Sequence, residues 1–447
     1  MADAERILHP FRGIRYGTNE SPDLSKLIAP PYDVISEEKQ AELNARSEHN
    51  FVRIELPQGA TETRYAQAAA LLPQWLSEGV LAREADPAFY LLEQEFTVES
   101  RRWRRRGVFG LVRLPEEEES YVLSHEGTLP EPKADRLLLM RACRAMTSPI
   151  MLMAEDGDGA LMRLLAGVTG EPGAAARDSD GTVHKLWVVR DSAMVAALSG
   201  AIGLGPLYIA DGHHRFETAS AYRDEMCRAR PAASPDAGYN YALVLVNSAQ
   251  DEGLRIFPTH RLISGLDETA WERLRECMGR HFEVSTELVD EVGRGADLSW
   301  LEGTTPGRPV FGVYRDSQLY HLAAKDSAVP AGAGVVDRLD VSVLHRRLIE
   351  PMRAGAGGSS SGRISHDSHA AGRAEPGARL TYTTDAREAM AAVDRGDYDL
   401  AFFLRPTRVS EVMAAARAGE RMPGKSTYFY PKIPAGLVVS DASEEPI

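Results

Sequence analysis

The sequence predicts an α/β (α+β) fold in which mixed sheets surround a strand–turn–helix core and a further α/β section follows. Residues 207–210 form a short apolar run typical of a strand, and Asp211 with Gly212 is a turn signal. From His213 onward, apolar and small residues recur at helical spacing. Residues 241–247 are a nearly continuous apolar run, as expected for a strand buried on both faces.

The predicted turn is the densest polar constellation in the chain, with the side chains of Asp211, His213, His214 and Arg215. The first N–H groups of a helix have no intrahelical partner, and the macrodipole adds partial positive charge there. Such a turn suits a phosphate or carboxylate group, and Gly212 permits the tight approach. These side chains can instead have purely structural roles, with Asp211 as an N-cap and Arg215 as a surface cation paired with Glu217.

Composition excludes some classes of function. The chain has 447 residues, a formal net charge of −14 and a pI of about 5.4, so nucleic acid is not expected as the main partner. The basic block at residues 101–106 and the acidic block at 116–119 are expected to be solvated turns around a hairpin strand. Three widely spaced cysteines, no leader pattern and no long apolar run indicate a cytoplasmic protein without a membrane span.

Four sections are predicted along the chain. An N-terminal α/β domain carries the polar turn, a second α/β section follows, then a flexible Gly/Ser-rich insertion, and a C-terminal α/β segment completes the fold. Their ranges are 1–261, 262–353, 354–379 and 380–447. Within the first, residues 50–56 alternate like a strand and 63–81 read as an amphipathic helix.

Two loops carry further candidate site residues. A double proline in residues 27–35 predicts a rigid loop that presents Tyr32 and Asp33, or a plain connector before a helix. Residues 124–136 are expected to be a loop rich in function-capable groups, among them His125 and Glu126.

A second His–Arg pair, His260 and Arg261, follows a proline and is read either as a phosphate contact or as a surface corner. Residues 419–426 formally match a Walker A pattern, but they follow a helix instead of a strand, so an ordinary P-loop is not expected. Lys425 in this stretch can still donate to a bound phosphate. His366 and His369 are not expected to form a metal site.

Several stretches resemble the bacterial and archaeal family called domain of unknown function 1015. They read H-P-F-R-G-I-R-Y, A-P-P-Y-D-V-I, S-H-E-G-T, A-D-G-H-H-R-F-E-T-A, P-T-H-R and M-P-G-K-S-T-Y-F-Y-P-K, and they span nearly the whole chain. The D-G-H-H-R turn also resembles the phosphate-binding turn of the ParB/sulfiredoxin-like superfamily, which includes free serine kinases. This second resemblance covers only a short motif. It implies that residues 211–215 hold nucleotide phosphates and that an upstream carboxylate acts on the serine hydroxyl.

The resulting hypothesis is a kinase, or phosphotransferase, for a small hydroxylated metabolite, with serine favoured. Mg²⁺ with ATP or ADP would be the cofactors, and Asp211 the metal ligand. Asp33 or Glu126, favoured over Glu55, would act on the hydroxyl, with His214 also catalytic. Tyr32, Asp33 and His125 would bind substrate. Gly212, His213, His214, Arg215, His260, Arg261 and Lys425 would hold phosphates.

Two alternatives use the same pocket. One is a phosphatase with a phosphohistidine intermediate, and the other is a ParB-like nucleotide-binding regulator without enzymatic activity. A small-molecule substrate and a nucleotide are the expected partners. The sequence leaves open whether the chain forms a homodimer.

Overall fold

A computed structural model describes residues 7–17, 23–116, 119–128, 130–203, 205–232, 234–289, 298–302, 307–353 and 378–447. The chain divides into two compact units. Unit 1 comprises Met1–Ser124, Thr128–Arg255 and Phe429–Ile447, and unit 2 comprises His125–Gly127 and Ile256–Tyr428. The insertion predicted at 354–379, with His366 and His369, lies outside the described residues except for 378 and 379.

Unit 1 is built on a nine-stranded mixed sheet with the order β6-β11-β8-β12-β5-β4-β10-β9, to which β1 adds by pairing with β5. These strands are β1 (Leu8–His9), β4 (Phe89–Val98), β5 (Arg101–Arg113), β6 (Val122–Leu123), β8 (Ile150–Ala154), β9 (Ala174–Arg177), β10 (Val183–Val189), β11 (Leu207–Asp211) and β12 (Tyr241–Ser248). Every residue of β12 is buried, as its apolar run predicted. Two pairs, β11 with β6 and β12 with β8, are parallel, and the other pairs are antiparallel.

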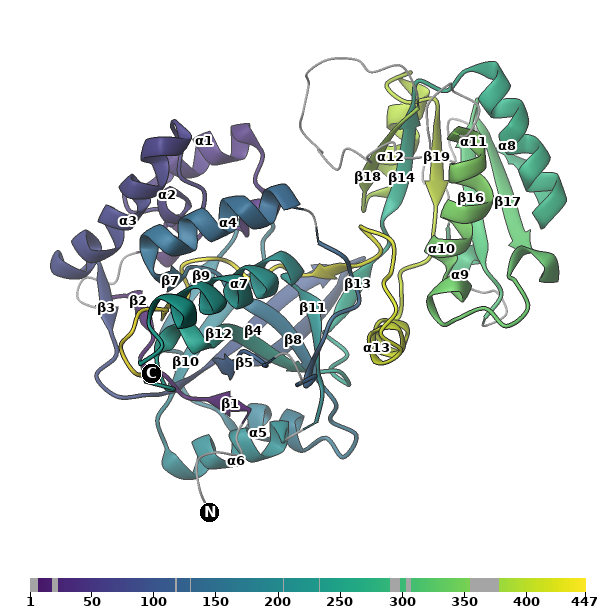
Figure 1. Ribbon diagram of the computed structural model, residues 1–447. Coiled ribbons are helices and arrows are strands. Elements are labelled where there is room, and N and C mark those ends of the chain that lie inside the picture. Colours follow the sequence, from purple (N-terminus) through teal and green to yellow (C-terminus); the bar gives the residue numbers. More distant parts are fainter. Residues whose placement is uncertain are drawn as a thin grey trace. The chain divides into compact units, whose positions relative to one another are not determined.

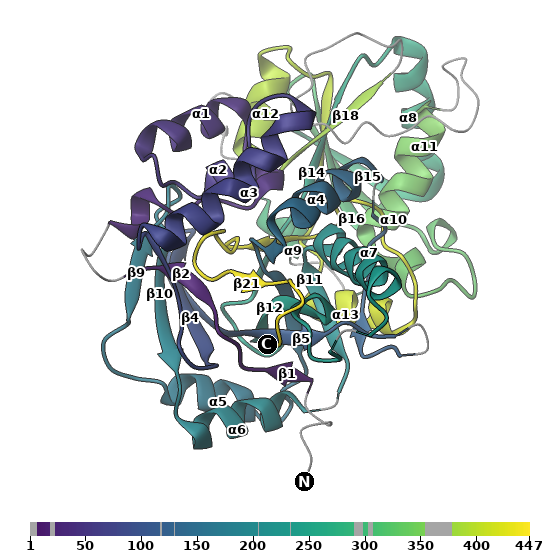
Figure 2. The same ribbon diagram turned by 60° about the vertical axis from the view of Figure 1, so that its left-hand side comes forward.

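Helices cover both faces of this sheet (Figures 1 and 2). They are α1 (Glu37–Arg46), α2 (Val52–Glu55), α3 (Thr61–Ser77), α4 (Pro130–Cys143), α5 (Ala160–Gly167), α6 (Ser192–Ile202) and α7 (His213–Ala229). Helices α4 and α7 lie side by side over one face, and α5 and α6 over the other. Short strands complete the unit: β2 (Ile14–Tyr16) with β3 (Leu81–Arg83), and β7 (Ala145–Met146) with β21 (Ser440–Asp441).

Unit 2 contains an antiparallel sheet with the order β15-β17-β16-β19-β14-β18. Its strands are β14 (His260–Ser264), β15 (Phe282–Leu288), β16 (Val310–Arg315), β17 (Gln318–Ala324), β18 (Arg379–Thr383) and β19 (Leu400–Phe403). Its helical segments are α8 (Glu268–His281), α9 (Ser299–Glu302), α10 (Asp340–Leu344), a π-helical turn His345–Ile349, α11 (Glu350–Arg353), α12 (Ala386–Asp394) and α13 (Val409–Arg417).

The side chains of β19 alternate between two hydrophobic clusters. Leu400 and Phe402 pack with residues of α8 and α11, whereas Ala401 and Phe403 pack with residues of α9 and α12. The period-2 alternation of strand side chains thus gives the sheet a helix-covered core on each face. A separate two-stranded sheet pairs β13 (Arg255–Phe257) with β20 (Tyr428–Tyr430).

The predicted mixed α/β class is confirmed, but three local predictions are wrong. Within the predicted strand 50–56, residues 52–55 form helix α2 instead, and the Asn50 side chain accepts from the Val52 N–H at the start of that helix. The basic block belongs to β5 instead of a turn, with Arg105 fully buried. Residues 130–136 lie in α4 instead of a loop, because a proline fits at the first helical position.

The Walker A reading is excluded by the backbone, as expected. Gly419 follows α13, and the chain after Ser426 enters strand β20 instead of a helix. Among the described residues, none of the helices is both long and apolar enough to cross a membrane.

Candidate functional site

The strand–turn–helix core is present in unit 1 as predicted. Strand β11 ends at Asp211, and α7 begins at His213 after a single linking residue, Gly212. Gly212 has φ = 94°, in the left-handed region that favours glycine. A Cβ atom there would lie 2.9 Å from Arg215 Nε, so glycine is needed for the backbone and for the close side chain.

Asp211 is the ionic centre of the turn. Its Oδ2 accepts from Arg215, and its Oδ1 accepts from Lys432 Nζ at 2.5 Å. Burial works to raise the Asp211 pKa, but the charges of Lys432 and Arg215 outweigh it and hold that pKa well below its usual range. Asp211 is therefore not a helix cap, and Arg215 is buried and not a surface cation.

This arrangement does not suit Asp211 to the predicted role of Mg²⁺ ligand. Each carboxylate oxygen already faces a cation, and a divalent ion would have to displace one of them. Arg215 is held further by the carbonyl oxygen of Pro149. Asp211 thus fixes the cations of the turn.

The two histidines of the turn differ in access. His213 is buried, whereas His214 is half-buried at the start of α7. One turn later, Glu217 Oε2 accepts from Thr128 Oγ1 at 2.5 Å and from Lys133 Nζ at 3.1 Å. Burial works to raise the Glu217 pKa, but these two donors and the charge of His214 lower it overall. The start of α7 thus combines a half-exposed imidazole with an organised polar cluster.

The loop with Tyr32 and Asp33 lies near this turn within unit 1. It forms a 3₁₀ turn, Tyr32–Val34, after a proline, which leaves the Asp33 side chain exposed. Burial works to lower the Arg215 pKa, but the carboxylates of Asp211 and Asp33 outweigh it and raise that pKa. Two motifs that lie about 180 residues apart in the sequence are therefore electrostatic neighbours.

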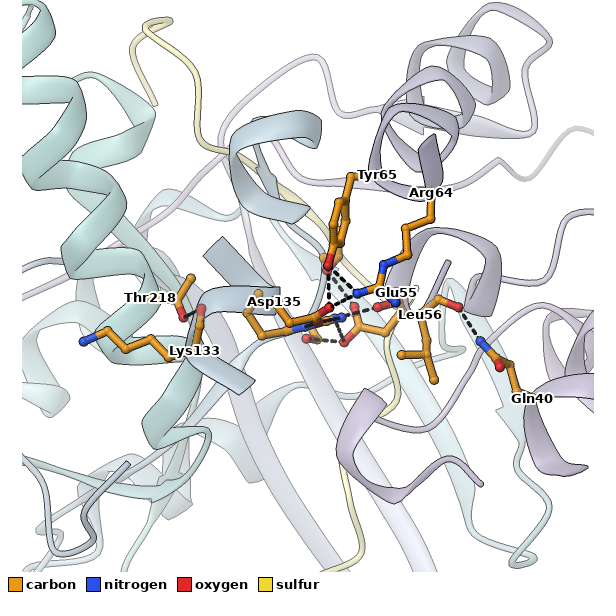
Figure 3. A network of polar contacts seen from close by, with 11 residues as sticks. Gln40, Glu55, Leu56, Arg64, Tyr65, Lys133, Asp135 and Thr218 are labelled. Atoms are coloured by element: carbon orange, nitrogen blue, oxygen red, sulfur yellow. Dashed lines mark hydrogen bonds and ion pairs between the residues drawn. The ribbon is translucent and has the colours of Figure 1, made fainter. Parts of the chain in front are cut away.

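Arg136 holds the Tyr32 side of the site. Its guanidinium carbon lies 4.2 Å from the centroid of the Tyr32 ring, a cation–π contact, and its Nη1 donates to Glu55 O at 2.6 Å. Asp135 accepts from Arg136 Nε at 2.9 Å, and its other oxygen accepts from Arg64 and Tyr65 (Figure 3). This network of polar contacts ties α4 to α2 and α3 beneath the loop.

Glu55, the third carboxylate considered for the hydroxyl, is enclosed. Its side chain is fully buried and accepts from Thr147 Oγ1 at 2.6 Å and Ser148 Oγ at 2.9 Å. Arg136 Nη1 lies 3.9 Å from Glu55 Oε1. A carboxylate so satisfied is a structural anchor, whereas the Asp33 side chain is exposed.

The other predicted residues belong to unit 2, where some of them cluster. Lys425 donates its backbone N–H to Glu126 Oε1 at 3.3 Å, and the Met422 N–H donates to the His125 carbonyl oxygen at 2.8 Å. Lys425 has φ = 57°, which places it in the left-handed region. The carbonyl oxygen of Lys425 accepts from Arg261 Nη2 at 3.1 Å.

His260 and Arg261 are both buried, so the surface-corner reading is wrong. The His260 ring packs edge-on against Phe403, and its Nδ1 accepts from the Leu404 N–H at 3.4 Å. Burial, and then the charge of Arg261, lowers the His260 pKa to about 4, so the ring is neutral at pH 7. Arg261 is the cation of this pair.

The predicted residues therefore fall into two groups, one in each unit, and a single site made from all of them stays a prediction. Sequence reasoning assigned no role to Lys432 or Thr259, although both lie in stretches that carry the family resemblance. The signal for these two residues was their place in those stretches, but their partners come from distant parts of the chain. Arg136 lies outside the quoted stretches, in the charged segment 124–136.

No curated protein matches the chain. A conserved hypothetical protein from Pyrococcus furiosus is similar in structure, with a TM-score of 0.34, 15% identity, and 75% of this chain and 95% of that one covered. A free serine kinase in complex with AMP has a TM-score of 0.36 and 14% identity, covering 74% and 92%. C-terminally truncated SbnI from Staphylococcus aureus has a TM-score of 0.35 and 12% identity, covering 73% and 84%.

A protein-family model matches most of the chain. The family is described as a protein of unknown function and called DUF1015, and the match covers residues 8–342. That range includes the Tyr32 loop, the Asp211 turn and the His260–Arg261 pair. The chain belongs to the DUF1015 family.

Proposed function

We propose that this protein is a phosphotransferase that moves a phosphoryl group from a nucleotide to a small hydroxylated metabolite, with L-serine as the first acceptor to test. The observation that carries the proposal is that exposed Asp33 is an electrostatic neighbour of Arg215 at the start of α7, close enough to raise the Arg215 pKa. Phosphoryl transfer to a hydroxyl needs a general base near an anion site.

Phosphate groups would bind at the turn through the first backbone N–H groups of α7 and through His214. Gly212 lets the ligand approach the backbone, and no side chain caps this helix start. The first intrahelical backbone bond runs from Phe216 N to Gly212 O, so the N–H groups before it point out of the helix. Arg215 and Lys432 would add positive potential from behind the turn.

Asp33 would accept the proton of the acceptor hydroxyl. The hydroxyl oxygen forms the new bond to phosphorus, the bond from phosphorus to the leaving nucleotide phosphate breaks, and the proton moves to the Asp33 carboxylate. Asp33 is preferred over Glu55, which is fully buried among hydrogen-bond donors. Mg²⁺ would neutralise charge on the nucleotide phosphates when bound with them.

The test is a phosphoryl-transfer assay read by phosphorus NMR, with Mg²⁺, ATP or ADP, and a panel of hydroxy amino acids and sugars. We expect a new phosphomonoester signal whose rate falls by about 100-fold or more in Asp33→Asn. The matched control is Asp86→Asn, because Asp86 is also an exposed aspartate of unit 1. Equal rates in all three proteins would refute the role of Asp33.

Two outcomes favour the alternatives. Release of inorganic phosphate from phosphomonoesters without nucleotide identifies a phosphatase, for which half-buried His214 is the candidate nucleophile. Saturable nucleotide binding with no transfer to any acceptor identifies a regulator.

A further inference from the structure

Unit 2 encloses a small cavity of about 50 Å³. Its lining includes four arginines, Arg261, Arg338, Arg405 and Arg408, but only two acids, Asp340 and Glu411. Both acids are already engaged. Asp340 accepts from Arg405 Nε at 2.8 Å and from its Nη2 at 2.9 Å, and Glu411 accepts from the Arg408 N–H at 2.8 Å. The cavity therefore carries excess positive charge.

Arg261 is the unusual member of this lining. Its side chain is 1% exposed, and its Nη1 and Nη2 donate only to carbonyl oxygens, those of Thr259 and Lys425. Its Nε has no hydrogen-bond partner among the described residues, and no described carboxylate pairs with it. Burial lowers the Arg261 pKa to about 10, which shows how poorly the charge is compensated.

A second residue of the cavity lining, Thr259, also has a buried donor without a hydrogen-bond partner. Its Oγ1 is buried and makes no hydrogen bond in the described part of the chain. Buried donors are nearly always satisfied, so two unsatisfied ones on residues that line one cavity point to an external acceptor. Arg105 of unit 1 is the contrast, because its Nε donates to Gln94 and its two Nη atoms donate to Gln94 and to carbonyl oxygens.

We propose that this cavity binds a phosphate group, which accepts from Arg261 Nε and Thr259 Oγ1. Its volume exceeds the roughly 10–15 Å³ that one water needs, yet it is far below the roughly 300 Å³ of small-molecule pockets. A lone oxyanion group fits these bounds, and a whole nucleotide does not. A doubly charged phosphate also matches the two-charge excess of the lining. This site is lined by residues of unit 2 alone and does not depend on the proposed transfer activity.

The test is titration calorimetry of the full-length chain with inorganic phosphate at constant ionic strength. The main variant is Thr259→Val, which keeps the side-chain shape and removes only the hydroxyl. We expect saturable binding in the wild type, with one class of sites weakened at least about tenfold in Thr259→Val and in Arg261→Lys. Arg387→Gln is the control, because Arg387 is an exposed arginine of unit 2, and it should bind as the wild type does.

Further arms identify the site and the ligand. His214→Ala and Asp33→Asn should not change phosphate binding at the class of sites that Thr259→Val weakens. This result would separate the proposed phosphate site from the proposed transfer function. A phosphomonoester that binds at this class more tightly than inorganic phosphate would show that the cavity receives the phosphate of a larger metabolite. Acetate that competes equally well would overturn the assignment to phosphate. Identical isotherms for the wild type and Thr259→Val, or no binding up to about 10 mM phosphate, would overturn the site itself.

Discussion

Lys432 Nζ lies 2.5 Å from Asp211 Oδ1, although 221 residues separate the two in the chain. The other oxygen of the same carboxylate accepts from Arg215. The C-terminal segment of unit 1 thus completes the charge balance of the turn that begins α7. One carboxylate shared by two cations orders the turn.

Replacing Asp211 removes the charge that both cations share. We expect Asp211→Asn to lower the free energy of unfolding by about 3 kcal/mol, because largely buried positive charges lose their compensation. Lys432→Met should cost less, since Arg215 still balances the carboxylate. Urea denaturation measures both. Asp224→Asn is the control, because Asp224 pairs with Arg223 at the surface, and it should change stability by less than about 0.5 kcal/mol. Additive effects in the Asp211→Asn/Lys432→Met double variant would contradict the coupling.

Gly212 is predicted to be required for more than its backbone conformation. Gly181 has a similar positive φ of 84°, but a Cβ atom there would meet nothing within 4 Å. We expect Gly181→Ala to cost about 1 kcal/mol and Gly212→Ala at least about 1 kcal/mol more, because Arg215 must also shift. Urea denaturation of the two variants separates the steric effect from the backbone effect. Equal losses would show that the contact with Arg215 does not matter.

Glu55 is predicted to contribute to the stability of unit 1, whereas Asp33 is not. Glu55→Gln should destabilise unit 1 by about 2 kcal/mol, because an amide cannot accept from both Thr147 and Ser148 through two carboxylate oxygens. Asp33→Asn should leave the free energy of unfolding within about 0.5 kcal/mol, since the side chain is exposed. Thermal and urea unfolding report both values. A stable Glu55→Gln protein that has lost phosphoryl transfer would instead make Glu55 the base.

His260 should make unit 2 sensitive to acid. Burial lowers its pKa from 6.5 to about 4, so between these values the unfolded state binds more protons than the folded state. Stability is then fully present above pH 6.5 and is lost as pH falls toward 4, by up to about 3 kcal/mol. Urea denaturation between pH 4 and 7 measures this slope. It should flatten in His260→Gln, and an unchanged slope would assign the acid sensitivity to other groups.

Local pattern predicted much of the secondary structure. The apolar run of β12 and the turn at Asp211 and Gly212 were both evident, since burial on one or two faces leaves a period in the sequence. The same reasoning failed at residues 50–56. Five residues there are buried, namely Asn50, Phe51, Val52, Ile54 and Glu55, so burial alone does not distinguish a strand from a helix. Thr147 and Ser148, from a distant segment, receive the Glu55 side chain into the core.

The sequence alone determined the α/β class, the strand–turn–helix core and which polar residues were worth attention, because short-range spacing and turn chemistry encode these features. Only the tertiary structure decided what each of those residues does. Asp211 is bound by Lys432, Arg105 is satisfied by carbonyl oxygens of Tyr430 and Pro431, and Arg261 lines a cavity without pairing to any described carboxylate. The physical reason is that a charge is stabilised by whatever lies within a few ångströms, and its neighbours in space are supplied by segments hundreds of residues away.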